Sequence, residues 1–534
     1  MNILRSIGQC LLFSFFICSG SLGFAFQPSS DQRDSFELLE MEIPQLQKLM
    51  ESGARSSKAL TKLYIDRIEA IDRNGYQLRS VIEINPDAIA IATQLDEERK
   101  AKGPRGPLHG IPILIKDNID TADKMSTTAG SLALIGPAPD KDAFIVQRLR
   151  AAGAVILGKT NLSEWANIRS SYSTSGWSGR GGQTRNPYVL DRNPCGSSSG
   201  SGAAVSANLC SVAIGTETNG SIVCPSSACG IVGIKPTVGL ISRAGIIPIS
   251  SSQDTAGPMA RTVRDAAILL SILPGQDPED SVTSESERHK QSDYTRYLDA
   301  EALKGARIGV ARNFFKPVGK LDKIMDASLQ AMRDAGAELI EFESLNSIDD
   351  VGAAQTIVLE YELKASMADY FAHRGQRSPM KTLAELIEFN QANQDTEMKY
   401  FAQDFFEAAQ KRGPLTDFAY LEAKAKCLRL ARTEGVDAAM DEHKLDAIVA
   451  PTLGPACPID LVNGDHWLGG STDLSAISGY PSISVPGATV QGLPVGLTFI
   501  GKRWSEPTLI KLSYAFEQKT KVRKPPEFKP SLSW

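Results

Sequence analysis

The chain has 534 residues, of which 42% are hydrophobic and 22% are charged, and its formal net charge is −5. This composition is typical of a soluble globular protein, and the acidic balance argues against a nucleic-acid or anionic-membrane partner. Beyond the extreme N-terminus no run of 20 apolar residues occurs, which argues against a polytopic membrane protein.

The first 25 residues have the pattern of a secretory signal peptide. Arg5 supplies a positive charge, residues 10–18 form an apolar core, and Gly23 and Ala25 place small residues where a signal peptidase cleaves. We therefore expect residues 1–25 to be removed and the mature chain to be exported, periplasmic or secreted, without stable membrane insertion afterwards. A retained anchor is the first alternative, but the apolar core is short for one. A lipoprotein cleaved before Cys18 is the second, but the small residue usual before a lipidated cysteine is absent.

Cysteine and histidine patterns give little support for a metal site. Six cysteines follow the signal segment, and in an oxidising compartment some of them could pair. The five histidines are scattered, and neither a CxxC nor an HExxH motif is present. We therefore expect neither a metal nor any other cofactor. The sequence does not indicate an oligomeric state.

The predicted elements alternate between helices and short buried strands. Apolar spacing predicts helices within residues 35–100 and, further on, over 142–152, 199–208 and 262–273. Short apolar runs predict buried strands at 111–115, 154–157, 212–215, 307–311, 447–450, 482–485 and 495–500. Residues 170–187 read as a loop, and residues 321–436 as a helical layer or cap. This alternation predicts an α/β fold with a mixed central sheet that helices cover on both faces.

Two common motifs match the sequence in unsuitable contexts. Residues 153–160, GAVILGKT, fit the phosphate-loop pattern, but a helix precedes them and their own apolar residues favour a buried strand. Residues 196–200 fit GxSxG, which would make Ser198 the nucleophile of an α/β-hydrolase elbow. The segment before it is poor strand material, and no downstream histidine has a suggestive context. Neither motif predicts function here.

A third arrangement combines one lysine with two serines. Lys116 follows five residues of an apolar run, and burial lowers the pKa of a lysine toward values at which its amine is neutral. Ser197 lies in a serine-rich turn, and Ser221 follows Gly220, which has no Cβ to block the approach of a carbonyl group to the backbone. Taken singly, these features also fit a surface lysine, a linker and a tight turn. Together they would form a hydrolytic site without histidine.

These residues lie within a series of segments that resembles the amidase signature family. The segments are HGIPILIKDN, GKTNLSEWAN, CGSSSGSGAA, GTETNGSIVCPSS, GIVGIKPTVGLIS and QDTAGPMAR, which follow one another in the family's order from about residue 108 to 260. Flanking segments, among them SGYPSISVPGATVQGLPVGLTFIG, resemble the bacterial peptide amidases of that family. The resemblance covers residues 36–525 and implies a single large amidase domain with its signature core at 108–260.

The resemblance also implies roles for individual residues. Lys116 matches the catalytic lysine, Ser197 the bridging serine (typically held in a cis peptide) and Ser221 the nucleophile. The oxyanion hole would consist of main-chain N–H groups from Thr218, Asn219, Gly220 and Ser221. The chain departs from the usual pattern at Asn219 and at Glu217, where glycine and aspartate are common, and we expect the Asn219 side chain to narrow the acyl pocket. For Asp254 and Arg261 a structural role is expected.

The implied activity is hydrolysis of a carboxamide by a Ser-Ser-Lys triad, giving a carboxylate and ammonia through an acyl-enzyme. The C-terminal amide of a peptide is the expected substrate, and fatty-acid, aryl or other small amides are the alternative. Two further hypotheses for the function are a transamidosome subunit and a catalytically inactive binding protein. We expect Trp165, Trp177 and Arg180 either to contact the peptide or to stabilise their loop by packing.

Overall fold

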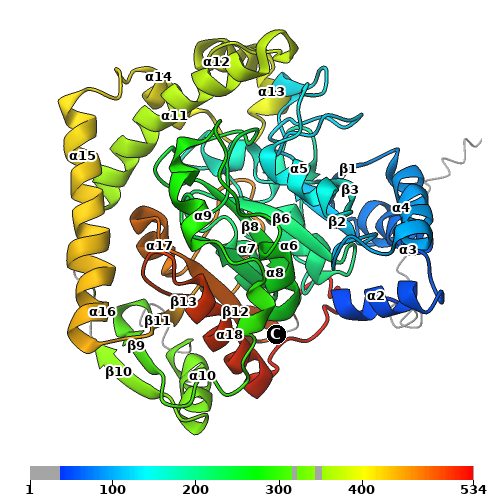
Figure 1. Cartoon of the computed structure of the whole chain (residues 1–534). Coiled ribbons are helices and arrows are strands. Elements are labelled where there is room, and N and C mark those ends of the chain that lie inside the picture. Colours follow the sequence, from blue (N-terminus) through cyan, green and yellow to red (C-terminus); the bar gives the residue numbers. More distant parts are fainter. Residues whose placement is uncertain (1–35, 316–320, 343–344, 346–350, 533–534) are drawn as a thin grey trace, which may run out of the picture.

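A mixed sheet of 11 strands runs through the molecule (Figure 1). The structure is a computed structural model that describes residues 36–315, 321–342, 345 and 351–532, so the expected signal peptide lies outside the described residues. The strand order is β1-β3-β2-β6-β8-β7-β12-β13-β11-β9-β10. The strands are β1 (Val81–Ile84), β2 (Pro112–Lys116), β3 (Val155–Thr160), β6 (Val212–Glu217), β7 (Val232–Lys235), β8 (Thr255–Ala260), β9 (Arg307–Ala311), β10 (Glu338–Phe342), β11 (Ala447–Pro451), β12 (Ser482–Val490) and β13 (Leu493–Ile500).

Helices flank this sheet, so the expected α/β fold with a mixed sheet is confirmed. They are α2 (Ile43–Glu51), α3 (Ser57–Arg67), α4 (Ala88–Lys102), α5 (Phe144–Ala151), α6 (Ser199–Ser206), α7 (Val223–Ala228), α8 (Val263–Leu270), α9 (Ser286–His289), α10 (Leu321–Asp334), α11 (Gly352–Arg374), α12 (Leu383–Ala392), α13 (Gln394–Glu397), α14 (Asp404–Gln410), α15 (Phe418–Leu428), α16 (Asp437–His443), α17 (Thr472–Ser478) and α18 (Glu506–Thr520). None of the helices in the described part of the chain has the length and apolar character needed to span a bilayer.

Helices α11 to α15 form an outer layer, with α12 along the top of the view and α15 along its left side (Figure 1). Helices α11, α12 and α14 share an apolar core with Leu134, Leu162 and Trp165 from the signature region. The helical layer expected over residues 321–436 therefore begins at α11, because β10 in the first part of that segment belongs to the sheet.

The central strands are buried on both faces, and this explains why they read as apolar runs. Strand β2 pairs in parallel with β3 on one side and with β6 on the other. Every residue of these three strands is buried, as expected for parallel strands covered by helices. Parallel pairing brings the carboxyl ends of β2 and β6 to the same edge of the sheet, and the candidate site lies there.

Four strands of the sheet were not expected from the sequence: β1, β7, β8 and β10. Strand β8 (TAGPMA) contains glycine and proline, which are depleted in strands, yet it pairs with β6 and β7. Its Gly257 has little room for a side chain, because a Cβ there would collide with the carbonyl oxygen of Ile234. Packing against neighbouring strands outweighs local propensity at these positions.

Candidate active site

Lys116, the last residue of β2, is fully buried and faces two hydroxyl groups. Its Nζ lies 2.8 Å from Ser197 Oγ and 2.9 Å from Thr216 Oγ1. Burial lowers the pKa of Lys116 to about 7, and the negative charges of Asp254 and Glu217 only partly oppose this shift. At neutral pH a large fraction of the amine is therefore unprotonated and able to accept a proton.

Ser197 follows a cis peptide bond at Gly196, as the family resemblance implies. A Cβ at position 196 would collide with Ser163 Oγ and force that hydroxyl to move. The main chain of the next residue, Ser198, donates a hydrogen bond of 3.1 Å to the carbonyl oxygen of Ser221. This bond fixes the serine-rich turn against the turn that carries Ser221.

Ser198 itself is held by the main chain of β6. Its Oγ donates to the carbonyl oxygen of Thr216 over 3.1 Å and accepts from the Thr216 N–H over 3.2 Å. No strand precedes it, since the described residues 184–196 form turns and loop. The surroundings of Ser198 therefore differ from those of a nucleophile elbow.

Ser221 lies in the turn between β6 and α7, and 7% of its surface is exposed. Gly220 adopts a positive φ of 78°, and a Cβ there would lie 2.9 Å from Cys224 Sγ. The carboxylate of Glu217 accepts hydrogen bonds from the N–H groups of Ile222 (2.7 Å) and Val223 (3.0 Å). Glu217 thus holds the turn in place, although aspartate is usual at this position in the family.

The candidate oxyanion hole is supported from two sides. Thr218 Oγ1 donates to Asp254 Oδ1 over 2.5 Å, which gives Asp254 the structural role expected for it. The side chain of Asn219 contacts α17, where Nδ2 donates to Asp473 (2.6 Å) and Oδ1 accepts from Thr472 (2.8 Å). The Asn219 side chain thus ties the turn to a helix far away in the sequence, a contact that the sequence did not predict.

A cavity of about 300 Å³ adjoins these residues. Thr216 and Thr218 of the β6–α7 segment form part of its wall, and so do Asn118, Ile247 and Tyr370. Because Thr216 also accepts a hydrogen bond from Lys116, the cavity lies next to the candidate catalytic amine. It offers room for a small organic group beside the site.

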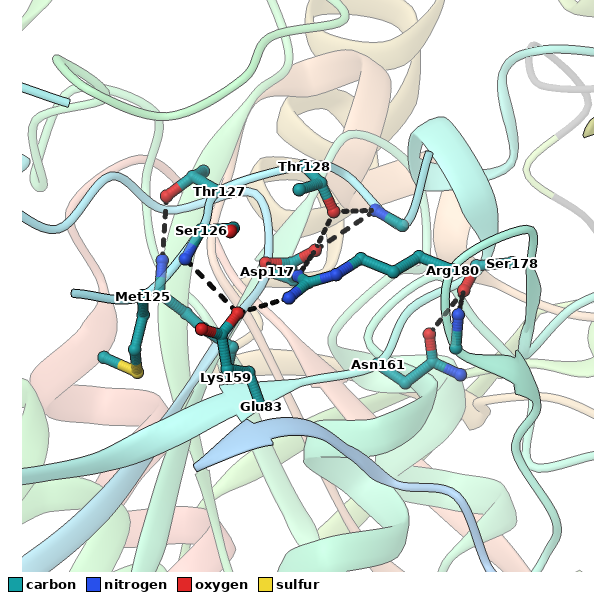
Figure 2. Close-up of polar contacts among 12 residues, drawn as sticks. Glu83, Asp117, Met125, Ser126, Thr127, Thr128, Lys159, Asn161, Ser178 and Arg180 are labelled. Carbon is teal, nitrogen blue, oxygen red and sulfur yellow. Dashed lines mark hydrogen bonds and ion pairs between the residues drawn. The ribbon is translucent and has the colours of Figure 1, made fainter. Parts of the chain in front are cut away.

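Arg180 is one of three residues expected as possible peptide contacts, and the structure places it in an ion-pair network. Figure 2 shows its guanidinium between Asp117 and Glu83. The Nη1–Oδ1 distance to Asp117 is 3.4 Å, and burial raises the pKa of this carboxyl group while Arg180 and Lys159 lower it. Since Asp117 follows Lys116 directly, Arg180 braces the strand end that carries the amine.

The other two candidates are tryptophans buried among aromatic side chains. Trp165 is 3% exposed and packs edge-on against Phe406, while Trp177 is 5% exposed and packs against Tyr400 and Phe401. None of the three candidates lines the cavity beside Thr216. Their contact with a substrate stays a prediction.

Several other residues have structural roles. The guanidinium of Arg261 donates to the carbonyl oxygens of Cys210 (2.9 Å) and Met41 (2.7 Å), in agreement with its expected role. Lys159 of the phosphate-loop pattern is a buried residue of β3, and its Nζ donates to Thr127 Oγ1 over 2.9 Å.

The cysteines of the described chain are free and buried: Cys195, Cys210, Cys224, Cys229, Cys427 and Cys457.

Sequence reasoning missed Thr216 and Asn118, which both contact the catalytic cluster. Thr216 Oγ1 accepts from Lys116 Nζ and also from Asn118 Nδ2, the latter over 3.0 Å. Asn118 lies two residues after the lysine in the segment HGIPILIKDN, so its closeness to Lys116 could have been predicted from the sequence. The orientation of Thr216 depends on how β6 pairs with β2, which no local pattern reveals.

Comparison with known proteins gives consistent results. Residues 59–510 match the amidase family. The structure is similar to the peptide amidase of Stenotrophomonas maltophilia, with 50% identity and a TM-score of 0.89 over 92% of this chain and 99% of that one. A peptide amidase in complex with the competitive inhibitor chymostatin is 51% identical, with a TM-score of 0.89 over 92% of this chain and all of that one. A probable amidase of Arabidopsis thaliana is 42% identical over 92% of this chain and 93% of its own length.

Proposed function

Because the chain belongs to the amidase signature family and is a hydrolase of amide C–N bonds, we propose that Lys116, Ser197 and Ser221 carry its reaction as a triad. One observation supports this most strongly: the fully buried Lys116 amine, whose pKa is lowered to about 7, lies 2.8 Å from Ser197 Oγ. A neutral amine in hydrogen-bond contact with a hydroxyl is the arrangement that a general base requires.

In the proposed reaction, Ser221 Oγ attacks the carbonyl carbon of the carboxamide. Ser197 takes the proton of Ser221 and passes its own to Lys116. The main-chain N–H groups of residues 218–221 stabilise the negative oxygen of the tetrahedral intermediate, where losing one such donor typically costs about 100–1000-fold in rate. The proton returns through Ser197 to the departing nitrogen, and ammonia leaves. Water then cleaves the acyl-enzyme by the same relay and releases the carboxylate.

We propose that the substrate is the C-terminal amide of a peptide. The support is the similarity of the whole fold to two solved structures of peptide amidase, whose chains are 50% and 51% identical to this one. Fatty-acid, aryl and small amides are the alternative substrates within the family. A panel of amidated dipeptides and tripeptides, benzamide and oleamide separates these substrates, and we expect the peptide amides to have the highest kcat/KM. A higher kcat/KM for benzamide or oleamide would contradict the peptide assignment.

The triad is tested by ammonia release from an amidated peptide. Ser221→Ala and Lys116→Ala should each abolish release, because the first removes the nucleophile and the second the base. Ser198→Ala is the matched control, since this serine follows Ser197 in the same turn and is equally buried, but its hydroxyl bonds only to the main chain of Thr216. We expect it to keep most of the activity. An inactive Ser198→Ala beside an active Ser221→Ala would overturn the assignment.

We also propose that the mature protein is exported after removal of residues 1–25. The support is the charge, apolar core and small residues of that segment. Mass spectrometry of the protein from its native host, after separation of the cell fractions, tests this proposal. We expect a chain that begins at Phe26 and is absent from the cytoplasmic fraction. A full-length cytoplasmic chain would contradict it.

A further inference from the structure

Asn118 has a buried amide group of which only the nitrogen has a hydrogen-bond partner among the described residues. Its residue is 2% exposed, and its Nδ2 donates to Thr216 Oγ1 over 3.0 Å. Its Oδ1 is buried and has no hydrogen-bond partner among the described residues. A buried acceptor without a partner costs free energy, so such a group in a folded protein calls for a specific explanation. Asn118 also lines the cavity beside the candidate catalytic residues, where a ligand could supply the missing donor.

The position of Asn118 is fixed relative to the catalytic amine. Thr216 Oγ1 is the common acceptor for Asn118 Nδ2 at 3.0 Å and Lys116 Nζ at 2.9 Å. The backbone adds a second constraint, because only Asp117 separates the two residues and Arg180 braces that carboxylate. The Asn118 amide group is therefore held close to the Lys116 amine through their shared partner, Thr216 Oγ1. In the proposed mechanism the proton that reaches the departing nitrogen comes from this amine.

We infer that Asn118 Oδ1 accepts a hydrogen bond from the nitrogen of the scissile carboxamide and so makes the site selective for amides over esters. This inference rests on the proposed function. A primary carboxamide carries two N–H groups, and donating one to Asn118 completes the buried acceptor while it orients the nitrogen toward Ser197. An ester places an oxygen without a hydrogen at the same point. Two acceptors then face each other and the ester is disfavoured.

The test compares two substrates with the same peptide acyl group, one an amide and the other an activated aryl ester. Asn118→Ala should lower kcat/KM for the amide by about 10- to 100-fold, the range expected when one hydrogen bond to the reacting group is lost. The kcat/KM for the ester should change by less than about threefold, because the ester never made that bond. The ratio of ester to amide kcat/KM therefore rises by about 10- to 100-fold if the ester rate is unchanged, and by at least about threefold if the ester rate falls by its full allowance.

A second variant separates this role from a purely structural one. Asn118→Asp keeps an acceptor oxygen in the same place and loses the donor to Thr216. Both substrates are measured at the same pH, so that a change in the Lys116 pKa caused by the new carboxylate affects the two rates equally. The variant should then keep the wild-type preference for the amide within about threefold. Labelling of Ser221 by a fluorophosphonate probe shows that each variant is folded. Equal losses on both substrates in Asn118→Ala, or loss of the preference in Asn118→Asp, would overturn the inference.

Failure of this inference is distinguishable from failure of the proposed function. If Ser221 is not the nucleophile, Ser221→Ala stays active and labelling by the probe does not depend on Ser221, so wild type and Ser221→Ala are labelled alike or neither is labelled. If only the role of Asn118 is wrong, wild type hydrolyses both substrates, the probe labels Ser221, and the ratio of the two rates stays unchanged in Asn118→Ala.

Discussion

At the scale of single residues, the chemistry depends on one amine whose charge the fold suppresses. Full burial lowers the pKa of Lys116 to about 7 from an ordinary value of 10.5. The sequence allowed this prediction, because an apolar run leads directly to the lysine. The sequence places Asn118 close to the lysine but did not reveal Thr216, which contacts both residues, because these contacts depend on how two strands distant in sequence pair side by side.

The turn at Gly220 provides a test at the same scale. Gly220→Ala places a Cβ 2.9 Å from Cys224 Sγ and forces a non-glycine residue to a φ of 78°. We expect kcat to fall by about 100-fold, because the displaced turn misdirects the main-chain donors to the oxyanion. Ammonia release from an amidated peptide measures this. Gly220→Ala/Cys224→Ala relieves the collision but not the strained φ, so it should recover only part of the rate. Full activity in Gly220→Ala would contradict a turn that depends on glycine.

At the scale of elements, the site depends on the parallel pairing of β2 with β6. Both strands could be predicted, since continuous apolar runs are typical of strands buried on both faces. Strand β8, which pairs with β6, could not be predicted, because its glycine and proline residues have low strand propensity. The contact between Asn219 and α17 could not be predicted either, since 250 or more residues separate the two partners in the sequence.

The ion pair between Arg180 and Asp117 at the end of β2 gives a second prediction. Arg180→Met removes the cation that forms an ion pair with the buried Asp117 and leaves only the charge of Lys159 acting on that carboxyl group, so we expect the free energy of unfolding to fall by roughly 2–4 kcal/mol. Urea denaturation measures the loss. The double variant Arg180→Met/Asp117→Asn should recover part of it, because a neutral amide needs no cation. If Arg180 instead contacts the peptide, KM rises while stability stays at the wild-type level, and that result would restore the substrate role.

At the scale of the whole molecule, buried charges connect the outer helical layer to the signature region. Glu164, in the signature segment GKTNLSEWAN, lies 3.0 Å from Arg169. Glu397 of α13 accepts a hydrogen bond of 2.7 Å from the N–H of Leu132. Burial raises the pKa of Glu164 well above its ordinary value, and Arg169 only partly opposes this while Glu397 adds to it. The sequence predicted the layer as a segment but gave no sign of these connections, because their charges lie in separate regions of the chain.

This cluster makes stability depend on pH. The folded state holds the Glu164 proton more tightly than the unfolded chain does, so the group favours folding at acidic pH. This stabilising contribution is fully present below the ordinary glutamate pKa of 4.5, and it is lost as the pH rises from there through the raised pKa of the folded state. Glu164→Gln is neutral at every pH, so its Tm should exceed that of wild type by roughly 1–3 °C near pH 8 and lose that advantage near pH 5. Parallel Tm curves for the two proteins would contradict a protonated Glu164.

The central claim is that a neutral Lys116 withdraws the proton of Ser221 through Ser197. The most direct measurement is the rate at which a fluorophosphonate probe labels Ser221 between pH 5 and 10, in wild type and in Lys116→Ala. We predict that the wild-type rate rises with pH and is half-maximal near pH 7, where the amine loses its proton, while the variant stays slow throughout. A wild-type rate that does not change with pH, or one that is half-maximal near the ordinary lysine value of 10.5, would contradict the account.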